Sequence, residues 1–273
     1  MNTPKVSIIM SIYRNPIKEI IASIESIINQ TFQDWEFIIC LDGSSEGIYK
    51  LLKEYERKES RIVVIYNKNN IGLAKSLNRC IKISSGEYIA RMDADDISLP
   101  IRLEYQLNFL EKNLEYSMVS CNVAYFNAKK VWGVSDLPLK PEKKDFLYNS
   151  PFVHPSIMMR RKIYIQLKGY RISKETRRTE DYDLFMRLYS LGYKGYNMRT
   201  VLYMYREDIN SLKKRKYCYR IDEMKVRFLG FKALGILNGN YRYVIKPLLV
   251  GLIPPIIMDY IRKEKYKLKN HEY

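Results

Sequence analysis

The stretch GEYIARMDADD, residues 86–96, places an apolar segment directly before three carboxylates within four residues. The apolar part is typical of a buried strand, and Asp93, Asp95 and Asp96 follow its end. Carboxylates that are crowded together repel one another unless a cation lies between them. A hard divalent cation takes oxygen ligands and often bridges to a phosphate. The stretch therefore predicts a strand whose carboxyl end carries a metal site.

Strand and helix patterns alternate around this stretch. The expected strands are 5–13, 36–41, 62–66 and 88–92, and the expected helices are 15–30, 49–58 and 73–84. Such alternation favours an α/β domain with a largely parallel sheet. Ligands of such sheets bind beyond the carboxyl ends of the strands. We therefore expect Tyr13, Asp42 and the Asp93–Asp96 cluster to converge on one edge of the sheet.

The second half of the chain is less regular. Strands are predicted at 118–126, 153–160 and 201–205, and a helix at 179–191. Thr179 can cap this helix, and four residues form its apolar face: Leu184, Phe185, Leu188 and Leu191. Beyond Ser211 the chain is expected to be helical and basic.

Four cysteines are scattered through the 273 residues without a CxxC spacing: Cys40, Cys80, Cys121 and Cys218. The spacing indicates neither a zinc site nor a disulfide framework, so a reducing compartment is the simpler reading. The first five residues lead straight into a strand and do not resemble a signal peptide. No apolar run approaches the roughly 18 residues expected of a membrane-spanning helix.

Positive charge is concentrated near the C-terminus. The net charge is +17, and residues 211–273 hold 15 Lys or Arg against 5 Asp or Glu. The apolar segment Pro247–Met258 lies between basic flanks and is interrupted by Gly251 and by Pro254-Pro255. This pattern suits a segment that lies at an anionic membrane surface. The alternative is a helix that packs on the rest of the protein and keeps a solvated basic face.

A series of blocks in fixed order resembles the family 2 glycosyltransferases, which are inverting enzymes with the GT-A nucleotide-diphospho-sugar transferase fold. The blocks are VSIIMSIYRN, SIINQTFQDWEFIICLDGSS, NIGLAKSLNRCI, SSGEYIARMDADDISLPIRLEYQ, PFVHPSIMMRR, LKGYR and TEDYDLFMRLYSLG. They span roughly residues 4–207. The resemblance implies a catalytic domain at 1–210, with a nucleotide-binding half (1–100) and an acceptor half (101–210). Residues 211–273 would form a basic helical extension that associates with membranes.

The resemblance implies distinct roles within the acidic cluster. Asp95, together with Asp93, would surround a Mn²⁺ or Mg²⁺ ion that bridges the diphosphate of a sugar nucleotide. Asp93 would also lean toward the ribose, and Ala94 would lie against the nucleotide. The bland alternative is that Asp93 or Asp96 caps a helix that starts near residues 99–100.

The other nucleotide contacts implied by the resemblance come from three segments of the chain. Asp42 would accept a hydrogen bond from the base, Tyr13 would stack on it, and Ser11 would contact the nucleotide. Asn70 and Lys75 fall in a block that approaches the nucleotide. Alternatively, Asp42 forms only a turn, and Tyr13 is a core residue.

The general base implied by the resemblance is Asp181, in the Glu-Asp pair of TEDYDLFMRL. Inversion requires a carboxylate that takes the proton of the acceptor hydroxyl. The helix dipole would lower the pKa of Asp181, whereas exclusion of water and the neighbours Glu180 and Asp183 would raise it. The sequence leaves this balance open. The alternative is an acidic first turn that only favours the helix.

Two further residues have both a functional and a structural interpretation. His154, in PFVHPS, could bind the metal or the phosphates, or it could be a satisfied core histidine. Trp132, beside Gly133, lies where an acceptor could stack, but a single tryptophan is more often part of a core.

The sequence thus predicts an inverting, metal-dependent glycosyltransferase that uses a UDP-sugar in preference to a dTDP- or GDP-sugar. The acceptor would be a glycan or a polyprenyl-diphosphate-linked sugar, extended at the cytoplasmic face of the cell membrane during surface polysaccharide synthesis. Two alternatives are a sugar-phosphate nucleotidyltransferase and a basic nucleic-acid-binding protein. No nucleic-acid-binding motif supports the latter, and its acidic cluster would repel phosphates without a metal.

Overall fold

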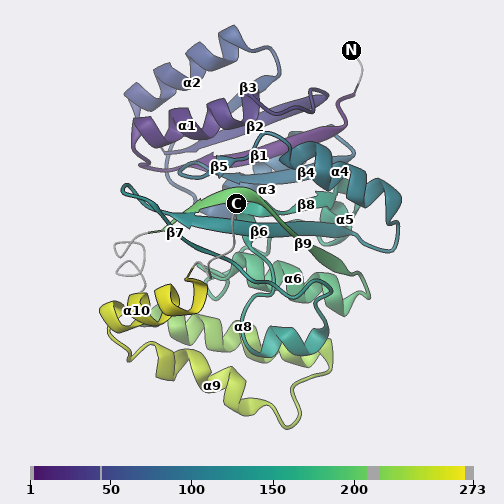
Figure 1. Ribbon diagram of the computed structural model, residues 1–273, viewed down its shortest axis with the longest axis vertical. Coiled ribbons are helices and arrows are strands. Elements are labelled where there is room, and N and C mark those ends of the chain that lie inside the picture. The colour runs from purple at the N-terminus through teal and green to yellow at the C-terminus, as the bar shows by residue number, and fades with distance from the viewer. Residues whose placement is uncertain (1–2, 44, 208–215, 268–273) are drawn as a thin grey trace.

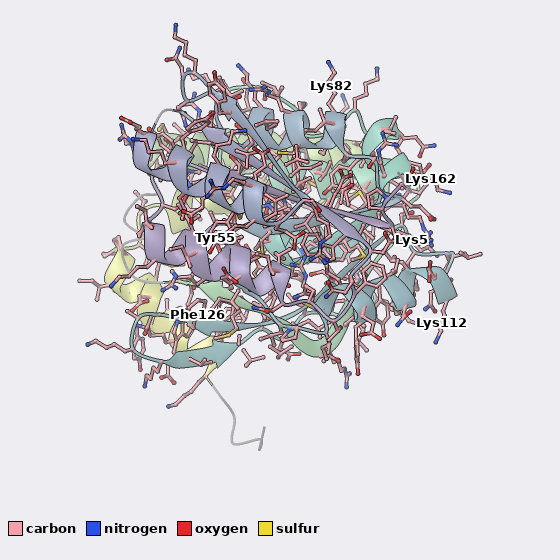
Figure 2. All side chains as sticks on the ribbon, turned by 90° about the horizontal axis from the view of Figure 1, so that it is seen from above. Lys5, Tyr55, Lys82, Lys112, Phe126 and Lys162 are labelled. Atoms are coloured by element: carbon pink, nitrogen blue, oxygen red, sulfur yellow. The ribbon has the colours of Figure 1, made fainter. Side chains whose placement is uncertain are left out.

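The computed structural model describes residues 3–43, 45–207 and 216–267. One nine-stranded sheet runs through the protein, in the strand order β3-β2-β1-β4-β8-β6-β9-β5, with β7 paired to β6. Figure 1 shows the sheet in the upper and middle part of the molecule and the C-terminal helices below it. The predicted α/β class is confirmed.

The first half alternates strands and helices as the sequence predicts. Strands β1 (Val6–Ile12), β2 (Trp35–Asp42), β3 (Ile62–Asn67) and β4 (Tyr88–Asp93) are parallel. Helices α1 (Ile17–Ile28), α2 (Glu46–Lys58) and α3 (Leu73–Ile83) connect them. All seven elements coincide with the predicted ones to within a few residues at each end, because short apolar runs and helical periodicity are strong local signals.

The second half completes the sheet with mixed pairing. Its strands are β5 (Ile97–Ser98), β6 (Met118–Phe126), β7 (Val131–Val134), β8 (Met158–Arg160) and β9 (Gly195–Arg206). Its helices are α4 (Arg102–Lys112), α5 (Arg161–Gln166) and α6 (Glu180–Ser190). The predicted strand at 153–160 is wrong in its first part, because residues 154–156 form a 3-10 turn around Pro155 and only the last three residues pair with β4 and β6.

Two hydrophobic cores lie on the two faces of the sheet. Helices α1, α2 and α4 cover one face, and α3, α5 and α6 cover the other. Because side chains alternate along a strand, β1 contributes Ile8 to the first core and Ile9 to the second. The second core also includes Val226 and Phe231 of α8, so this helix is packed into the fold.

The C-terminal helices are α8 (Cys218–Leu234), α9 (Tyr241–Val250) and α10 (Pro255–Tyr266). Helix α8 packs between α6 and α9, and α10 lies against β7. Among the described residues, no single helix is long and apolar enough to cross a membrane, and α9 with α10 reaches the required length only as a pair bent by 119°. The predicted boundary at residue 210 lies outside the described residues.

Candidate active site

The carboxyl ends of β1, β2 and β4 lie side by side at one edge of the sheet. Strand β1 lies between the other two, and Ser11 is level with Cys40 of β2 and with Asp93 of β4. Tyr13 follows β1 directly, and Asp42 is the last residue of β2. The nucleotide-binding residues predicted from β1, β2 and β4 therefore converge on one edge.

The Asp42 carboxylate is buried and holds the chain between β3 and α3. One oxygen accepts hydrogen bonds from Asn67 Nδ2 and the Ile71 N–H, both at 2.8 Å. The other accepts from Asn70 Nδ2 at 2.9 Å and from the Gly72 N–H at 2.8 Å. Gly72 has a φ of 92°, which glycine adopts without strain. A nucleobase N–H would have to share an oxygen that already has two donors, and its contact with Asp42 stays a prediction.

Tyr13 presents an exposed ring at this edge. Its relative exposure is 46%, so it is not a core residue. The Arg14 guanidinium lies 5.1 Å from the ring centroid. Lys75 is exposed in the first turn of α3, whereas Asn70 is held by Asp42. An exposed ring beside the Arg14 guanidinium is suited to stacking on the base of an anionic nucleotide.

Asp93 is paired with a buried arginine that the sequence analysis did not single out. Arg91 is 1% exposed, and its Nη1 forms an ion pair with Asp93 Oδ1. The two residues are two positions apart in β4, so their side chains share one face of the sheet. This spacing, together with an arginine inside an apolar strand, is the signal that could have revealed the pair. Ala94, between Asp93 and Asp95, is buried, and its contact with a nucleotide stays a prediction.

Asp95 and Asp96 have different environments. Burial and the nearby carboxylates of Asp93 and Glu19 raise the pKa of Asp95 to about 6. Asp96 is 2% exposed, and its Oδ1 accepts a hydrogen bond of 2.7 Å from the Arg206 N–H. Burial raises the pKa of Asp96 well above its ordinary value. Helix α4 has no side-chain cap, so the alternative of a capping aspartate is wrong.

The residues at the end of β4 fit a divalent cation that the substrate helps to hold. Within the described ranges, no three His, Cys, Asp or Glu residues are grouped so that they could hold a metal by themselves. Magnesium is commonly bound by one or two carboxylates together with substrate phosphates. The raised pKa of Asp95 shows that its negative charge is poorly compensated by the protein. Asp93 and Asp95 therefore fit a Mn²⁺ or Mg²⁺ ion that arrives with a diphosphate.

His154 is buried in the second core. Its Nε2 lies 2.7 Å from the Tyr170 hydroxyl, and its ring contacts Tyr170 and Phe185 edge-on. Burial and the positive charge of Arg91 lower the pKa of His154 well below its ordinary value. The imidazole is therefore neutral at pH 7, and one ring nitrogen is committed to Tyr170. A ligand role for His154 stays a prediction.

The first turn of α6 carries three carboxylates with different surroundings. Asp183 is buried and forms ion pairs with Arg171 at 2.7 Å and Arg187 at 2.8 Å. Burial and the charge of Asp181 raise the pKa of Glu180 to about 7. The raised pKa of Glu180 allows this carboxyl group to be partly neutral near pH 7. Asp181, the predicted base, lies next to it in the same helical turn.

Details of α6 differ from the sequence prediction. Thr179 occupies the position before the helix, but its side chain makes no capping hydrogen bond to the helix; its hydroxyl instead donates to the Glu175 carbonyl, at 3.3 Å. Leu184, Phe185 and Leu188 are buried as predicted, but Leu191 follows the helix and is 58% exposed. The helix is stabilised by its apolar face and by the ion pairs of Asp183. One of these ion pairs is with Arg171, which lies outside the helix.

Trp132 is half-buried and packs against the first core. It stacks on Tyr125, with ring centroids 5.0 Å apart, and the pair lies beside Tyr266 of α10. The adjacent Gly133 approaches the Tyr266 backbone so closely that an added Cβ would be 2.6 Å from its carbonyl oxygen. The contacts thus favour the core interpretation of Trp132 and show that α10 packs on β7.

Comparison with known proteins gives a consistent result. The family model described as "Glycosyl transferase family 2" matches residues 7–167. The chain is 41% identical to the putative glycosyltransferase EpsE of Bacillus subtilis over 96% of this chain and 94% of that protein. It is 30% identical to WfaP of Escherichia coli, a UDP-Glc:alpha-D-GlcNAc-diphosphoundecaprenol beta-1,3-glucosyltransferase, over 89% of this chain and 94% of that protein.

Two solved structures share the fold. TarS of S. aureus in complex with UDP-GlcNAc matches with a TM-score of 0.67 at 17% identity, over 91% of this chain and 71% of that chain. The mannosyltransferase PcManGT of Pyrobaculum calidifontis, in complex with GDP-Man and Mn²⁺, matches with a TM-score of 0.62 at 16% identity, over 97% of this chain and 81% of that chain. At these identities the likeness shows the GT-A fold alone.

Proposed function

Since the chain belongs to glycosyl transferase family 2 and is a nucleotide-sugar-dependent glycosyltransferase of polysaccharide biosynthesis, we propose that it is an inverting, metal-dependent enzyme that uses a UDP-sugar. The observation that carries the proposal is the convergence of the exposed Tyr13 ring with Asp93 and Asp95 at the carboxyl edge of β1 and β4. The names of WfaP and of the TarS complex support a UDP-sugar donor.

In the proposed mechanism each side of the site has one task. Tyr13 stacks on the base, while Asp93 and Asp95 hold the cation, which would supply positive charge to the diphosphate as it leaves. The acceptor hydroxyl oxygen forms a bond to the anomeric carbon as the bond from that carbon to the diphosphate breaks. Asp181 takes the hydroxyl proton. The products are the elongated glycan and the nucleoside diphosphate.

Three arginine ion pairs support this division of tasks. The Arg91 guanidinium fixes the Asp93 carboxylate, so Asp93 approaches a ribose or a metal from one direction. Asp183 is neutralised by Arg171 and Arg187. These ion pairs give Asp183 a structural role, and the proposed base is Asp181, as the family resemblance implies.

A donor screen tests the reaction class. Purified enzyme is incubated with UDP-, dTDP- and GDP-sugars and Mn²⁺, and the released nucleotide is identified. The proposal expects release of UDP from a UDP-sugar and loss of that release when a chelator removes Mn²⁺. Release of pyrophosphate would instead support the nucleotidyltransferase alternative, and turnover that survives the chelator would remove the metal from the proposal.

The proposed acceptor is a sugar linked through diphosphate to a polyprenyl chain, as the name of WfaP describes for that relative. The enzyme would meet it at the cytoplasmic face of the membrane through α9 and α10. This region exposes Leu249 in α9, Leu252 between the two helices and Ile256 in α10, each at 64–70%. Basic residues flank them, a combination that favours binding to anionic lipid surfaces.

Membrane docking can be tested without disturbing the core. Helix α8 shares a core with α6, so removing the whole extension would expose buried residues. Replacing Leu249, Leu252 and Ile256 by serine changes only exposed positions. We expect this variant to lose sedimentation with anionic liposomes. The matched control replaces the exposed Leu114 and Ile165 by serine, and equal losses in both variants would contradict docking through α9 and α10.

A further inference from the structure

An apolar groove lies beside the segment that leads into α6. Its volume is about 520 Å³, within the range of small-molecule sites. Helix α8 provides most of its wall, and α9 and the segment 171–179 complete it. The lining residues are Glu175, Met224, Lys225, Phe228, Leu229 and Val244.

The wall of the groove is apolar where a solvated helix would be polar. Phe228 is 42% exposed and Leu229 47% exposed, while Met224 lies one turn before Phe228 on the same side of α8. Val226, about half a turn away from Met224, is buried in the second core, and Met224 itself packs partly against that core. Helix α8 is therefore apolar on both sides, and contiguous exposed apolar surface of this kind marks a binding site.

We call the segment 171–179 the rim of the groove, because it contributes Glu175 to the lining, and this segment carries several exposed cations. Lys174, Arg177 and Arg178 are exposed in the segment 171–179, and within the described ranges none of them forms an ion pair. Arg171, by contrast, is occupied by Asp183. Glu175 is the one carboxylate of this segment, and its pKa is lowered by its own backbone N–H, by Ser173 and by the nearby cations Lys225 and Arg171. The rim keeps an excess of cations.

The position of the rim relates it to the chemistry. Arg178 has a φ of 72°, which is uncommon for a residue other than glycine and which is typical of functional segments. It directly precedes Thr179, after which α6 begins with Glu180 and Asp181. A ligand held at Arg177 and Arg178 therefore lies within a few residues of the proposed base.

We propose that this groove holds the first isoprene units of a polyprenyl-diphosphate-linked acceptor, and that Lys174, Arg177 and Arg178 bind its diphosphate. An apolar chain joined to two phosphates matches an apolar groove with a cationic rim. Binding in this way would place the sugar beyond the diphosphate near Asp181. The inference rests on the proposed function, and it assigns a separate site for the lipid part of the acceptor.

Isoprenoid diphosphates of different length test the groove. Wild-type protein is titrated by calorimetry with geranyl, farnesyl and geranylgeranyl diphosphate below their micelle concentrations. Saturating UDP and Mn²⁺ are present, so that the nucleotide site is filled. We expect affinity to rise about tenfold with each added isoprene unit, less than full burial would give because the groove is open on one side. Inorganic diphosphate should bind far more weakly than the geranylgeranyl compound.

Two variants separate the groove from its rim. Replacing Phe228 and Leu229 by aspartate should remove the dependence on chain length. Replacing Arg177 and Arg178 by alanine should weaken all three probes about tenfold and leave that dependence intact. The matched control is Leu114→Asp, at a position that is 77% exposed in the loop after α4 and that should change neither. Thermal unfolding confirms that each variant is folded.

The outcomes distinguish the groove from the proposed reaction. A wild-type protein without chain-length dependence, or an aspartate variant that keeps it, would overturn the groove. If inorganic diphosphate binds as tightly as geranylgeranyl diphosphate, the site recognises phosphate alone and the proposed binding of isoprene units is wrong. If the enzyme releases no UDP from a UDP-sugar but its affinity still rises with chain length, the proposed reaction is wrong and the proposed groove is supported. If the enzyme releases UDP but its affinity does not depend on chain length, only the proposed groove is wrong.

Discussion

The nucleotide edge of the sheet and the acceptor side at α6 are built in opposite ways. At the nucleotide edge, Asp42 is buried and accepts four hydrogen bonds from β3 and from the chain before α3. On the acceptor side, Arg177 and Arg178 are exposed without ion pairs among the described residues, and Glu180 has a pKa near 7. Apolar side chains such as Phe228 are also exposed there.

This difference indicates which side is complete in the protein alone. Groups that the fold itself satisfies are held in one arrangement, as preorganised binding of a common donor requires. Unpaired cations and exposed apolar surface are instead satisfied by a ligand or a membrane. We infer that the donor side is preformed around Asp42 at the end of β2, whereas the metal site at Asp95 and the acceptor side depend on their substrates.

The largest expected effect comes from Asp95→Ala at the nucleotide edge. The variant removes a carboxylate whose pKa is raised by burial and by the nearby charges of Asp93 and Glu19. Transfer should fall by at least about a hundredfold, and Mn²⁺-dependent affinity for UDP should fall with it. Titration of UDP with and without Mn²⁺ measures the change. The exposed Asp34→Asn serves as control, and an unchanged Mn²⁺ effect in Asp95→Ala would remove Asp95 from the metal site.

A smaller effect is expected from Arg91→Met. The variant removes the buried partner of Asp93, so the Asp93 carboxylate loses its fixed direction. We expect the KM for the donor to rise about tenfold, with a smaller change in kcat. Arg160→Met, at another buried arginine, controls for the loss of a buried cation. Equal kinetic effects in both variants would contradict a specific role for Arg91.

The Asp42→Ala variant tests how far the nucleotide edge is preformed. Four donors would lose their acceptor, including the N–H groups of Ile71 and Gly72. We expect a loss of about 2–4 kcal/mol in the free energy of unfolding. Denaturant unfolding measures it. An unchanged free energy of unfolding would mean that water replaces the carboxylate, and it would contradict a preformed nucleotide edge.

The smallest effect concerns pH on the acceptor side. The pKa of Glu180 is raised to about 7 from an ordinary value of 4.5, so the folded protein binds more protons than the unfolded chain between these values. Stability from this group is therefore fully present below pH 4.5 and is lost as pH rises through 7. Glu180→Gln should be more stable than wild type at pH 8 by about 1–2 kcal/mol, and the gain should vanish near pH 4. A gain independent of pH would contradict the assignment.

Most of the first half could be predicted from sequence because its signals are local. Apolar runs and helical periodicity located β1 to β4 and α1 to α3, and the parallel arrangement placed Tyr13, Asp42 and Asp93 at one edge. The family blocks added the expected roles of Asp95 and Asp181. Neither source required knowledge of contacts between distant residues.

The errors and omissions arise where distant residues decide the structure. The apolar run at 153–160 resembles a strand, but Pro155 and the burial of His154 against Tyr170 favour a turn. The pairing of Asp183 with Arg171 joins a loop to a helix, and it separates this carboxylate from Glu180 and Asp181. Arg91 was missed because an arginine within an apolar strand gives no sign of its partner until the side chains are placed.

The central claim is that the β4 edge holds the donor while α6 takes the proton, and Asp181→Asn tests it most directly. The measurement compares UDP affinity in the presence of Mn²⁺ with the rate of sugar transfer in this single variant. The account predicts UDP affinity within about threefold of wild type and transfer reduced by about a hundredfold or more, as expected for loss of a general base. Transfer at the wild-type rate would contradict it.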